Sequence, residues 1–381
     1  MAFVAAHSII SPLGGTSAET FAAVLAGRSA VAEYAPVFAG GEPVWASKLP
    51  ADWIPPAQLG ELADYTRFEQ LLIASIADAS AQVGVDLASP RTVLVLATTK
   101  GNIGLLDDEP ALTDELFERL QLTHSARMVA AYFGSLATPV VVSNACISGV
   151  AALLVAQRLL VSGQYDAAVV AGADTVSRFV LSGFQAFQAL SAGPCRPFSE
   201  DRDGINLGEA AATIILTAAV PILAAGAPVR LAGGAISNDA NHISGPSRTG
   251  QELATAISEA LAAAQLTANA VDFIAAHGTA TPFNDAMEAK AFALAGVAGR
   301  PVSSVKGALG HTLGAAGLVE SVLGVLALQG GWRLPTAGYS QPMQSNPLAV
   351  AAAAAAADAR VALKTASGFG GCNGALVFVR E

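Results

Sequence analysis

One cysteine, two histidines and one lysine lie in glycine- and alanine-rich segments, and together these residue types suit acyl transfer. Cys146 ends the stretch Val-Val-Val-Ser-Asn-Ala-Cys, where a buried strand is expected to turn into a helix. His277 follows another apolar run, and Lys306 and His311 precede a second apolar helix. A thiol can carry an acyl group as a thioester, while imidazole and ammonium groups can stabilise developing negative charge. The set therefore predicts acyl transfer with a carbanion step.

The surroundings of Cys146 favour a reactive thiol. Unpaired amides at a helix N-terminus favour the thiolate and can also receive the negative oxygen of a tetrahedral intermediate. A free cysteine is more often a small buried apolar residue. Here the strand-to-helix turn and the small neighbours Ala145, Ser148 and Gly149 favour a nucleophile. We expect its pKa to lie below that of a free thiol.

The other candidate residues follow from their positions next to buried elements. His277 is expected at the carboxyl end of a strand, the edge where open α/β sheets bind ligands. Lys306, beside a buried helix, needs a charge partner or a function, and we expect an ion pair with Glu288. The alternatives are a structural histidine and a solvated loop lysine. Glycines in the loop 368–373 allow backbone amides to approach a ligand, and Phe369 is placed to gate the pocket.

The composition predicts a large folded interior and argues against several kinds of partner. Of the 381 residues, 53% are hydrophobic and 13% are charged, which is not typical of a disordered chain. The formal charge of −10 argues against a nucleic-acid partner. The three cysteines have no CxxC spacing, so we expect no metal site and no disulfide framework. Together with an N-terminus that lacks a basic signal region, this predicts a cytoplasmic protein.

Two long stretches without charged residues, 129–157 and 210–229, have to be weighed as membrane spans. Pro139 interrupts the first, and Pro221 and Pro228 interrupt the second. Because a lipid-exposed helix broken in this way is unfavourable, we expect no membrane insertion.

Apolar runs of strand length alternate with helical segments, which predicts an α/β protein with a mostly parallel sheet. Residues 92–97, 139–143 and 167–170 are expected as buried strands, and 66–81 as a helix. Thr16 and Glu19 predict a capping box for a helix that ends near Ala26. The alanine-rich run 349–357 is long enough for a helix or a packed loop.

A strand, a glycine-rich loop and an apolar helix occur twice, with the helices at 147–161 and 312–329. This predicts two similar halves. Residues 1–220 would carry the nucleophile and residues 225–381 the two histidines, with a crossover at 221–228.

Taken together, these motifs closely resemble the β-ketoacyl-acyl-carrier-protein synthases, the condensing enzymes of fatty-acid and polyketide synthesis. The matching segments include Ser11-Pro-Leu-Gly, Ala145-Cys146, Cys195-Arg-Pro-Phe-Ser-Glu-Asp-Arg-Asp-Gly, His277-Gly-Thr-Ala-Thr-Pro-Phe-Asn-Asp, Lys306-x4-His311 and Gly368-Phe-Gly-Gly-x-Asn. The resemblance implies the thiolase fold, an α/β fold of two similar halves packed as five layers (α-β-α-β-α).

The resemblance also implies a role for each matching residue. Cys146 would take the acyl chain, and the histidine pair would hold the thioester carbonyl of the malonyl-carrier protein and stabilise the enolate left by decarboxylation. Lys306, paired with Glu288, would organise the histidines. The amides of Cys146 and Phe369 would form the oxyanion hole. The remaining two positions, Thr279 and Thr281, would contact the phosphopantetheine arm.

The same resemblance implies no resident cofactor, because both substrates arrive on the phosphopantetheine of an acyl carrier protein. It implies a dimer, either with a second copy or with a related ketosynthase subunit. Four departures concern chain length and the malonyl site. They are Ile205 in place of a usual Phe, Thr365-Ala366-Ser367, the turn Thr98 to Asn102, and Ile147 after the nucleophile. They resemble divergent synthases of polyene-pigment pathways.

Three functions are considered as alternatives to that of an elongating synthase. A non-catalytic, chain-length-determining subunit of a ketosynthase heterodimer characteristically lacks the nucleophile. A degradative thiolase typically uses a second cysteine as base, and a papain-like hydrolase needs a Cys-His-Asn geometry. Acyl chain length, pathway and cognate carrier stay open.

Overall fold

The computed structural model describes residues 1–36, 41–107, 111–221 and 226–381, and it contains two runs of strands with the same topology. The first run is β1 (Phe3–Ile10), β4 (Thr92–Ala97), β5 (Val140–Val142), β6 (Ala167–Asp174) and β8 (Ala210–Thr217); the second is β9 (Val229–Asn238), β10 (Phe273–Ala275), β11 (Pro301–Ser303), β15 (Val361–Gly368) and β16 (Cys372–Arg380). Their spatial orders are β5-β4-β6-β8-β1 and β11-β10-β15-β16-β9. Numbered within each run, both orders read 3-2-4-5-1.

The strand directions also match between the two runs. Strands β4 and β10 pair in parallel with both neighbours, whereas β8 and β16 are antiparallel to theirs. A short antiparallel contact of β1 with β9 joins the runs into one 11-stranded sheet, which β13 (Ala349–Val350) extends. The sheet is therefore mixed. The prediction of a mostly parallel sheet holds only around β4 and β10, which pair in parallel with both of their neighbours.

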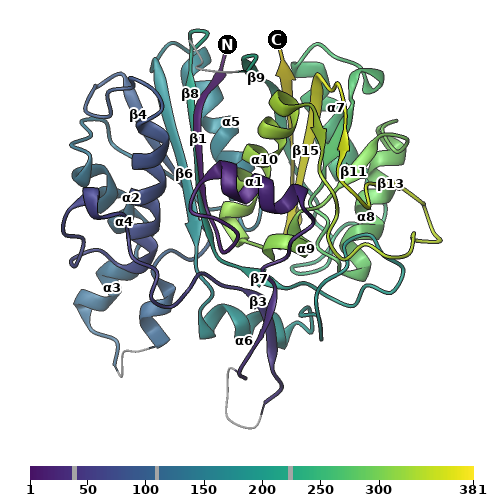
Figure 1. Ribbon diagram of the computed structural model, residues 1–381, viewed down its shortest axis with the longest axis horizontal. Helices are drawn as coiled ribbons and strands as arrows, with labels where there is room; N and C mark the ends of the chain where they lie inside the picture. The colour runs from purple at the N-terminus through teal and green to yellow at the C-terminus, as the bar shows by residue number, and fades with distance from the viewer. Residues whose placement is uncertain (37–40, 108–110, 222–225) are drawn as a thin grey trace.

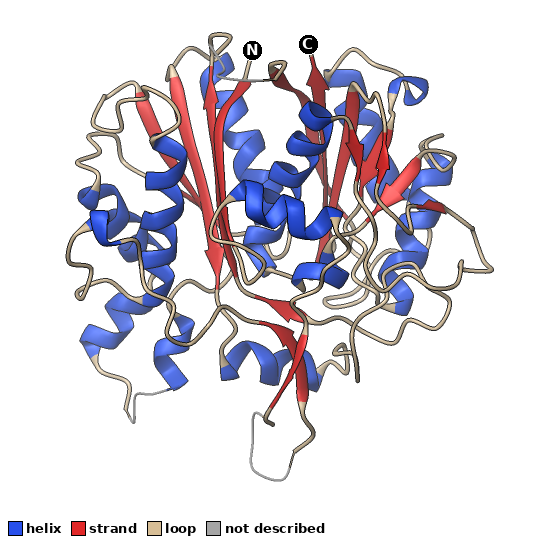
Figure 2. Ribbon diagram, viewed as in Figure 1, coloured by secondary structure: helices blue, strands red, loops and turns tan. Residues whose placement is uncertain are grey.

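Helices lie on both sides of each run and between the two runs, as Figures 1 and 2 show. Outside the first run lie α2 (Arg67–Ser80) and α4 (Leu122–Tyr132), and outside the second lie α7 (Gln251–Ala263) and α8 (Pro282–Leu294). Between the runs, α5 (Ser148–Val161) packs against α10 (Ala316–Gly330). Both central helices are largely buried, as their apolar sequences predict. The expected layer order α-β-α-β-α is confirmed.

Close packing of the two central helices depends on glycine. A Cβ at Gly149 would lie 2.7 Å from the backbone N of Leu318, and one at Gly317 would lie 2.6 Å from the backbone N of Val150. Real Cβ atoms do not approach a backbone that closely, so only glycine allows this separation of α5 and α10. Because Cys146 precedes α5 and His311 precedes α10, the crossing brings the two catalytic candidates together.

Local signals place the helix starts well. Thr66 and Glu69 form the complete capping box of α2, which begins one residue after the predicted start. Thr16 caps α1 (Ser17–Leu25), but the Glu19 carboxylate accepts from the backbone N of Gly15, so that box is only half formed. The predicted helix 312–329 is divided into a 3₁₀ turn, Leu313–Ala315, and α10.

The remaining elements are short. They are α3 (Asp114–Leu120), α6 (Arg178–Ala186), α9 (Lys306–Leu309), β2 (Ala32–Tyr34), β3 (Val44–Ser47), β7 (Leu207–Gly208), β12 (Trp332–Arg333), β14 (Ala355–Ala356) and 3₁₀ turns at Ala57–Leu59, Ile103–Asp107 and Ala268–Ala270. The alanine-rich run 349–357 contains the two short strands β13 and β14 and no helix. Of the predicted crossover 221–228, residues 222–225 lie outside the described part of the chain.

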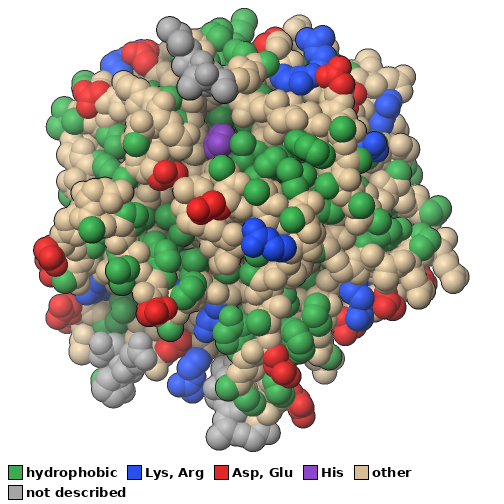
Figure 3. Space-filling model, viewed as in Figure 1, with side chains coloured by type: hydrophobic (Ala, Val, Ile, Leu, Met, Phe, Trp, Pro, Cys, Tyr) green, Lys and Arg blue, Asp and Glu red, His purple; other side chains and the backbone are tan. Residues whose placement is uncertain are grey.

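Among the described residues, one helical segment, Leu313–Gly330, is long and apolar enough to cross a membrane, and 83% of it is buried inside the protein. It is the central helix α10 with the 3₁₀ turn that precedes it, so its apolar character is explained by the core. On the face shown in Figure 3, basic and acidic side chains are interspersed among apolar and uncharged ones.

Candidate active site

Residues from both halves line one cavity of about 520 Å³, part of which is open to solvent. Cys146, His277 and His311 all contribute to its wall, so the thiol and the two imidazoles share one space. The other lining residues are Phe184, Ala189, Ile205, Ser244, Pro246, Thr279, Thr281, Asn284, Ser367, Gly368 and Phe369. Most of these side chains are apolar or uncharged, and such a cavity suits an acyl chain and a neutral thioester.

Cys146 lies on a tight turn between β5 and α5. Ala145 adopts φ 43°, a left-handed conformation that a non-glycine residue adopts at a cost. The Ser148 hydroxyl stabilises the turn, because it donates to the carbonyl of Ala145 at 2.6 Å and accepts from the backbone N of Asn144 at 2.8 Å. The thiol thus stands one residue before Ile147, the N-cap of α5.

The electrostatic prediction for this thiol is wrong in its direction. Burial raises the pKa of Cys146 to about 12, and nearby Cys372 adds to the rise. The Lys306 ammonium and the backbone amide of Phe369 lower the pKa, but their effect is smaller. Desolvation therefore outweighs the helix N-terminus, and the resting side chain is a thiol. A neutral thiol must lose its proton as it attacks, so it needs a base in the same cavity.

The two histidines form a buried pair and can supply that base. Their ring centroids are 5.1 Å apart with the planes at 86°. Burial, and the charges of Lys306 and Lys364, hold the pKa of both His277 and His311 well below the usual value. Both imidazoles are therefore neutral near neutral pH, and a neutral imidazole can accept a proton or donate a hydrogen bond.

Backbone contacts hold the pair in place. His277 lies two residues beyond β10, close to its predicted position at a strand end. His311 is fixed across the two halves, since its backbone N donates to Asn206 at 2.7 Å and its carbonyl accepts from the N of Gly208 at 2.9 Å. Within the described chain neither ring nitrogen of His311 has a hydrogen-bond partner, although the ring is buried. These two nitrogens are available to a substrate.

Lys306 orients His277 through contacts with its ring and its backbone carbonyl. Its fully buried Nζ lies 3.2 Å from Nδ1 of His277 and donates to the carbonyl of the same residue at 2.6 Å. Since an ammonium can only donate, Nδ1 accepts and the ring proton lies on Nε2. The Lys306 side chain is not solvated, which removes one of the alternatives considered above.

The predicted ion-pair partner of Lys306 is wrong. The structure pairs Lys306 with Glu320, on the inner face of α10, and the same carboxylate lies 2.6 Å from Nζ of Lys364. Glu288 has a different function, because its carboxylate accepts from the backbone N of His277 at 2.9 Å and of Gly278 at 2.6 Å. It shapes the His277 loop and forms no ion pair with Lys306.

Glu320 and Lys364 were both missed in the sequence, although a signal was present. Glu320 is the one charged residue in the apolar helix α10, and Lys364 interrupts the apolar start of β15. A charge in a segment otherwise suited to the core indicates a buried partner.

Two threonines and an aromatic group form part of the cavity wall. The hydroxyls of Thr279 and Thr281 are 2.9 Å apart, and Thr281 also caps α8. The ring of Phe369 stacks on Phe184 at 5.5 Å and meets Phe187 edge-on at 5.3 Å. All but Phe187 line the cavity.

The glycine loop lies directly against the nucleophile. A Cβ at Gly368 would be 2.9 Å from the backbone N of Cys146 and 3.0 Å from the sulfur of Cys372. The Phe369 amide faces the thiol, as its effect on the Cys146 pKa indicates. The backbone of this loop is thus close to both the amide and the thiol of Cys146.

Asp174 was also missed, and it links the two halves. It is buried at the end of β6, and burial raises its pKa to about 6. Its carboxylate accepts from the Thr98 hydroxyl at 2.8 Å and from the backbone N of Gly314 at 2.6 Å, in the loop that follows His311. The unusual turn 98–102 is therefore held by the same side chain that holds the His311 loop.

Two further departures in the sequence fall on the cavity wall. Ile205 and Ser367 both line it, and the Ser367 hydroxyl donates to Oδ1 of Asn373 at 2.8 Å. All three cysteines are free. Among the described residues, no group of three or more His, Cys, Asp or Glu side chains could hold a metal ion.

Two family models match the chain. One, described as "Beta-ketoacyl synthase, N-terminal domain", matches residues 51–220, and the other, "Beta-ketoacyl synthase, C-terminal domain", matches residues 229–340. The matched segments contain Cys146 in the first case and both histidines in the second.

Curated relatives have corresponding names. The 3-oxoacyl-[acyl-carrier-protein] synthase 2 of Vibrio cholerae is 30% identical over 99% of this chain and 98% of its own length. The protein of the same name from Mycobacterium leprae is 36% identical, but the match spans only 63% of this chain and 60% of that protein. The tetracenomycin polyketide synthase ketoacyl synthase alpha subunit of Streptomyces glaucescens is 32% identical over 74% of this chain and 69% of its own length.

Solved structures are similar over the whole chain. A ketosynthase (ApeO) in complex with its chain length factor (ApeC), from Xenorhabdus doucetiae, gives a TM-score of 0.87 at 26% identity, covering 100% of this chain and 98% of that one. The ishigamide ketosynthase/chain length factor gives 0.89 at 28% identity, covering 100% and 99%. Ketosynthases have the thiolase fold, so the predicted fold class is confirmed.

Proposed function

Because the chain belongs to the β-ketoacyl synthase family, we propose that it catalyses the decarboxylative condensation of an acyl group with malonyl-acyl carrier protein. The reaction would extend a fatty-acid or polyketide chain by two carbons. The observation that carries the proposal is the shared cavity of Cys146, His277 and His311, in which a thiol faces two neutral imidazoles.

In the first half-reaction, the sulfur of Cys146 attacks the thioester carbonyl of the acyl-carrier protein. A neutral imidazole accepts the thiol proton, and the amides of Cys146 and Phe369 stabilise the oxyanion. The carbon–sulfur bond to the carrier then breaks, and the phosphopantetheine thiol leaves with the proton. The product is an acyl group on Cys146, so one difficult condensation is divided into two easier steps.

In the second half-reaction, malonyl-carrier protein loses CO₂ and leaves an enolate. Nε2–H of His277 is the donor toward its oxygen, since Lys306 occupies Nδ1, and His311 has both ring nitrogens available. The enolate carbon attacks the Cys146 thioester, a carbon–carbon bond forms, and the cysteine sulfur leaves as a thiolate that takes a proton from solvent. The products are 3-oxoacyl-carrier protein and CO₂.

The positive charges of Lys306 and Lys364 near the two histidines support this assignment. A cation that contacts His277 favours its neutral state and polarises the Nε2–H bond toward developing negative charge. Both substrates are thioesters on a phosphopantetheine arm, so no resident cofactor is part of the proposal. Thr279 and Thr281, which line the cavity, are the proposed contacts of that arm.

Two partners are part of the proposal. One is an acyl carrier protein, and the other is a second ketosynthase chain, either a copy of this one or a related subunit. The two solved relatives described above contain a ketosynthase with its chain length factor, which favours a related subunit. Since all three cysteines are free, a reducing, cytoplasmic compartment is proposed.

The test uses acyl-carrier protein and malonyl-carrier protein with the purified protein and two cysteine variants. Cys146→Ala is expected to abolish formation of 3-oxoacyl-carrier protein, while Cys372→Ala, a matched buried control at the start of β16, is expected to retain it. Intact mass measurement of the carrier reports the product. Condensation by the Cys146→Ala variant would overturn the proposal, and its absence in the unsubstituted protein would favour a non-catalytic, chain-length-determining subunit.

A further inference from the structure

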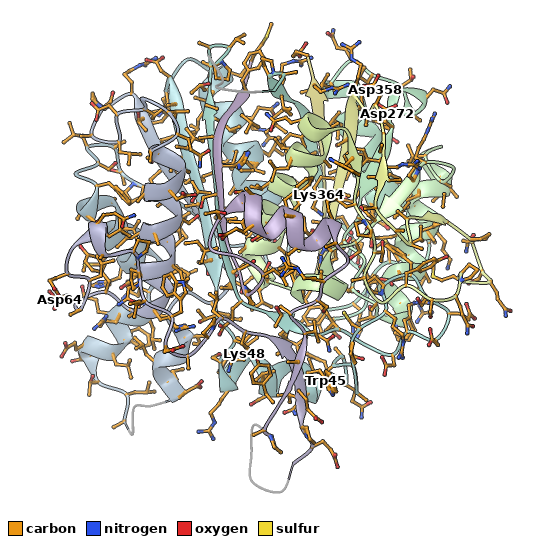
Figure 4. All side chains as sticks on the ribbon, in the orientation of Figure 1. Trp45, Lys48, Asp64, Asp272, Asp358 and Lys364 are labelled. Carbon is orange, nitrogen blue, oxygen red and sulfur yellow. The ribbon has the colours of Figure 1, made fainter. Side chains whose placement is uncertain are left out.

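Lys364 is a buried lysine that the proposed reaction does not use. It lies on β15, next to Ala275 of β10 in the sheet, and only 1% of its surface is exposed. Figure 4 labels it near the middle of the view, whereas Asp64, also labelled, lies at the left edge. Lysine is almost never fully buried without a partner, so its environment has to compensate the charge.

Among the residues that the structure describes, every polar contact of this ammonium is with an acceptor. Nζ forms an ion pair with Oε2 of Glu320 at 2.6 Å and donates to the carbonyls of Ala275, at 3.4 Å, and Thr365. A neutral amine would direct its lone pair at one of these oxygens. The contacts therefore suit the protonated form, even though burial lowers the pKa of Lys364 from its usual value.

In the cluster of two lysines and two glutamates formed by Lys306, Lys364, Glu320 and Glu288, the charges balance only when Lys364 is counted. Lys306 and Lys364 provide two positive charges. Glu320 lies between them, and Glu288 is a second buried carboxylate that receives four donors from His277, Gly278, Asn284 and Thr365. Two cations and two anions sum to zero. Without Lys364 the cluster would carry one unbalanced negative charge directly behind the histidine pair.

Both imidazoles respond to this charge. The titratable groups around them are Lys306 on α9, Glu320 on α10, Lys364 on β15, Glu288 and Asp285 on α8, Asp174 on β6 and the Cys146 thiol. The positive charge of Lys364 lowers the pKa of both His277 and His311. Removing that charge would raise both values, and a larger fraction of imidazolium would form at a given pH.

We propose that Lys364 is a positioning residue of the site: through the Glu320 carboxylate that it shares with Lys306, it balances the buried charge and keeps both imidazoles neutral for the malonyl step. The proposal rests on the condensation proposed above. It assigns no contact of Lys364 with substrate. Its effect is to keep both rings neutral, so that Nε2–H of His277 and the one N–H of neutral His311 are the donors toward the enolate oxygen.

The experiment separates the two half-reactions in Lys364→Met, which keeps the length of the side chain and removes the charge. At a pH above the acid limb, where both imidazoles are neutral in either protein, acylation of Cys146 from octanoyl-carrier protein is expected to change less than about twofold. Decarboxylation of malonyl-carrier protein is expected to have its acid limb moved up by about one pH unit, the order of effect of one nearby buried charge at an effective dielectric of about 20. On that limb the rate falls about tenfold. Lys364→Arg, which keeps the charge, is expected to retain the original limb.

A second readout needs no catalysis. The imidazoles of His277 and His311, assigned by single substitution, are titrated by NMR in the unsubstituted protein and in Lys364→Met. Both should titrate well below pH 6.5 in the unsubstituted protein and about one unit higher in the variant. Titration near pH 6.5 in the unsubstituted protein would overturn the proposal even if the variant fails to fold. Equal titration in the two folded proteins would also overturn it. A protein that titrates as expected but does not condense would overturn the proposed function alone.

Discussion

The Glu320 carboxylate separates two buried ammonium groups, and its removal gives a direct test of the charge cluster. Lys306 and Lys364 both form ion pairs with it, and both lysines are almost completely buried. In Glu320→Gln the amide keeps the volume but loses the negative charge. Two like charges are then left facing each other in the interior without their shared counter-ion.

The expected cost follows from the burial of this cluster. Removing one partner of a buried ion pair costs about 3–5 kcal/mol, because the other charge stays desolvated and uncompensated. Here two charges lose their partner, so the upper part of that range is expected. The free energy of unfolding is measured by urea titration, with tryptophan fluorescence as the signal.

Glu69→Gln is the matched control. Glu69 is equally buried, but its carboxylate accepts only from neutral groups, namely the backbone N of Thr66, the Asn102 amide and the Ser125 hydroxyl. Its loss is expected to be smaller, on the order of 1–2 kcal/mol. A loss below about 1 kcal/mol in Glu320→Gln, or one no greater than in the control, would refute the argument that Glu320 compensates two buried lysines.

Two further predictions concern pH and packing. Condensation should be lost on acidification, because the neutral imidazoles of His277 and His311 accept protons as the pH falls through their lowered pKa values. A plot of the condensation rate against pH should show this loss well below pH 6.5. A loss centred at or above pH 6.5 would contradict the argument that burial lowers both pKa values. Gly149→Val should destabilise the protein by at least about 1–3 kcal/mol in urea unfolding, since its Cβ would lie 2.7 Å from the backbone N of Leu318, whereas unchanged stability would show that α5 and α10 can separate.

The residues that could be recognised from the sequence stand at the ends of regular elements. Cys146, His277 and His311 follow strands or precede apolar helices, and their glycine-rich neighbours indicate loops that approach a ligand. Element type could be recognised in the same way, because hydrophobic periodicity and a capping box are local. In the structure the Cys146 thiol and both imidazoles line one cavity, as the sequence predicted.

The partner of Lys306 could not be recognised in this way. Glu320 is 14 residues from Lys306, and Lys364 is on a strand that pairs with β10. Which of several acidic residues reaches a buried lysine depends on how α10 crosses the sheet. Glu288 was the wrong choice because its carboxylate is occupied by the backbone amides of the His277 loop.

The pKa of Cys146 shows a limit of a different kind. The helix N-terminus is visible in the sequence and favours a thiolate, but the depth of burial is a property of the folded chain. In the structure burial has the larger effect and raises the pKa of Cys146 to about 12. The sequence thus indicates which charges act on a group, whereas their balance depends on how much solvent reaches it.

The measurement closest to the central claim is the location of the acyl group after the first half-reaction. The protein is incubated with octanoyl-carrier protein in the absence of malonyl-carrier protein, digested, and analysed by tandem mass spectrometry. The account predicts one octanoyl group, on the peptide that contains Cys146. An octanoyl group on Cys195 or Cys372, or none on any cysteine, would contradict it.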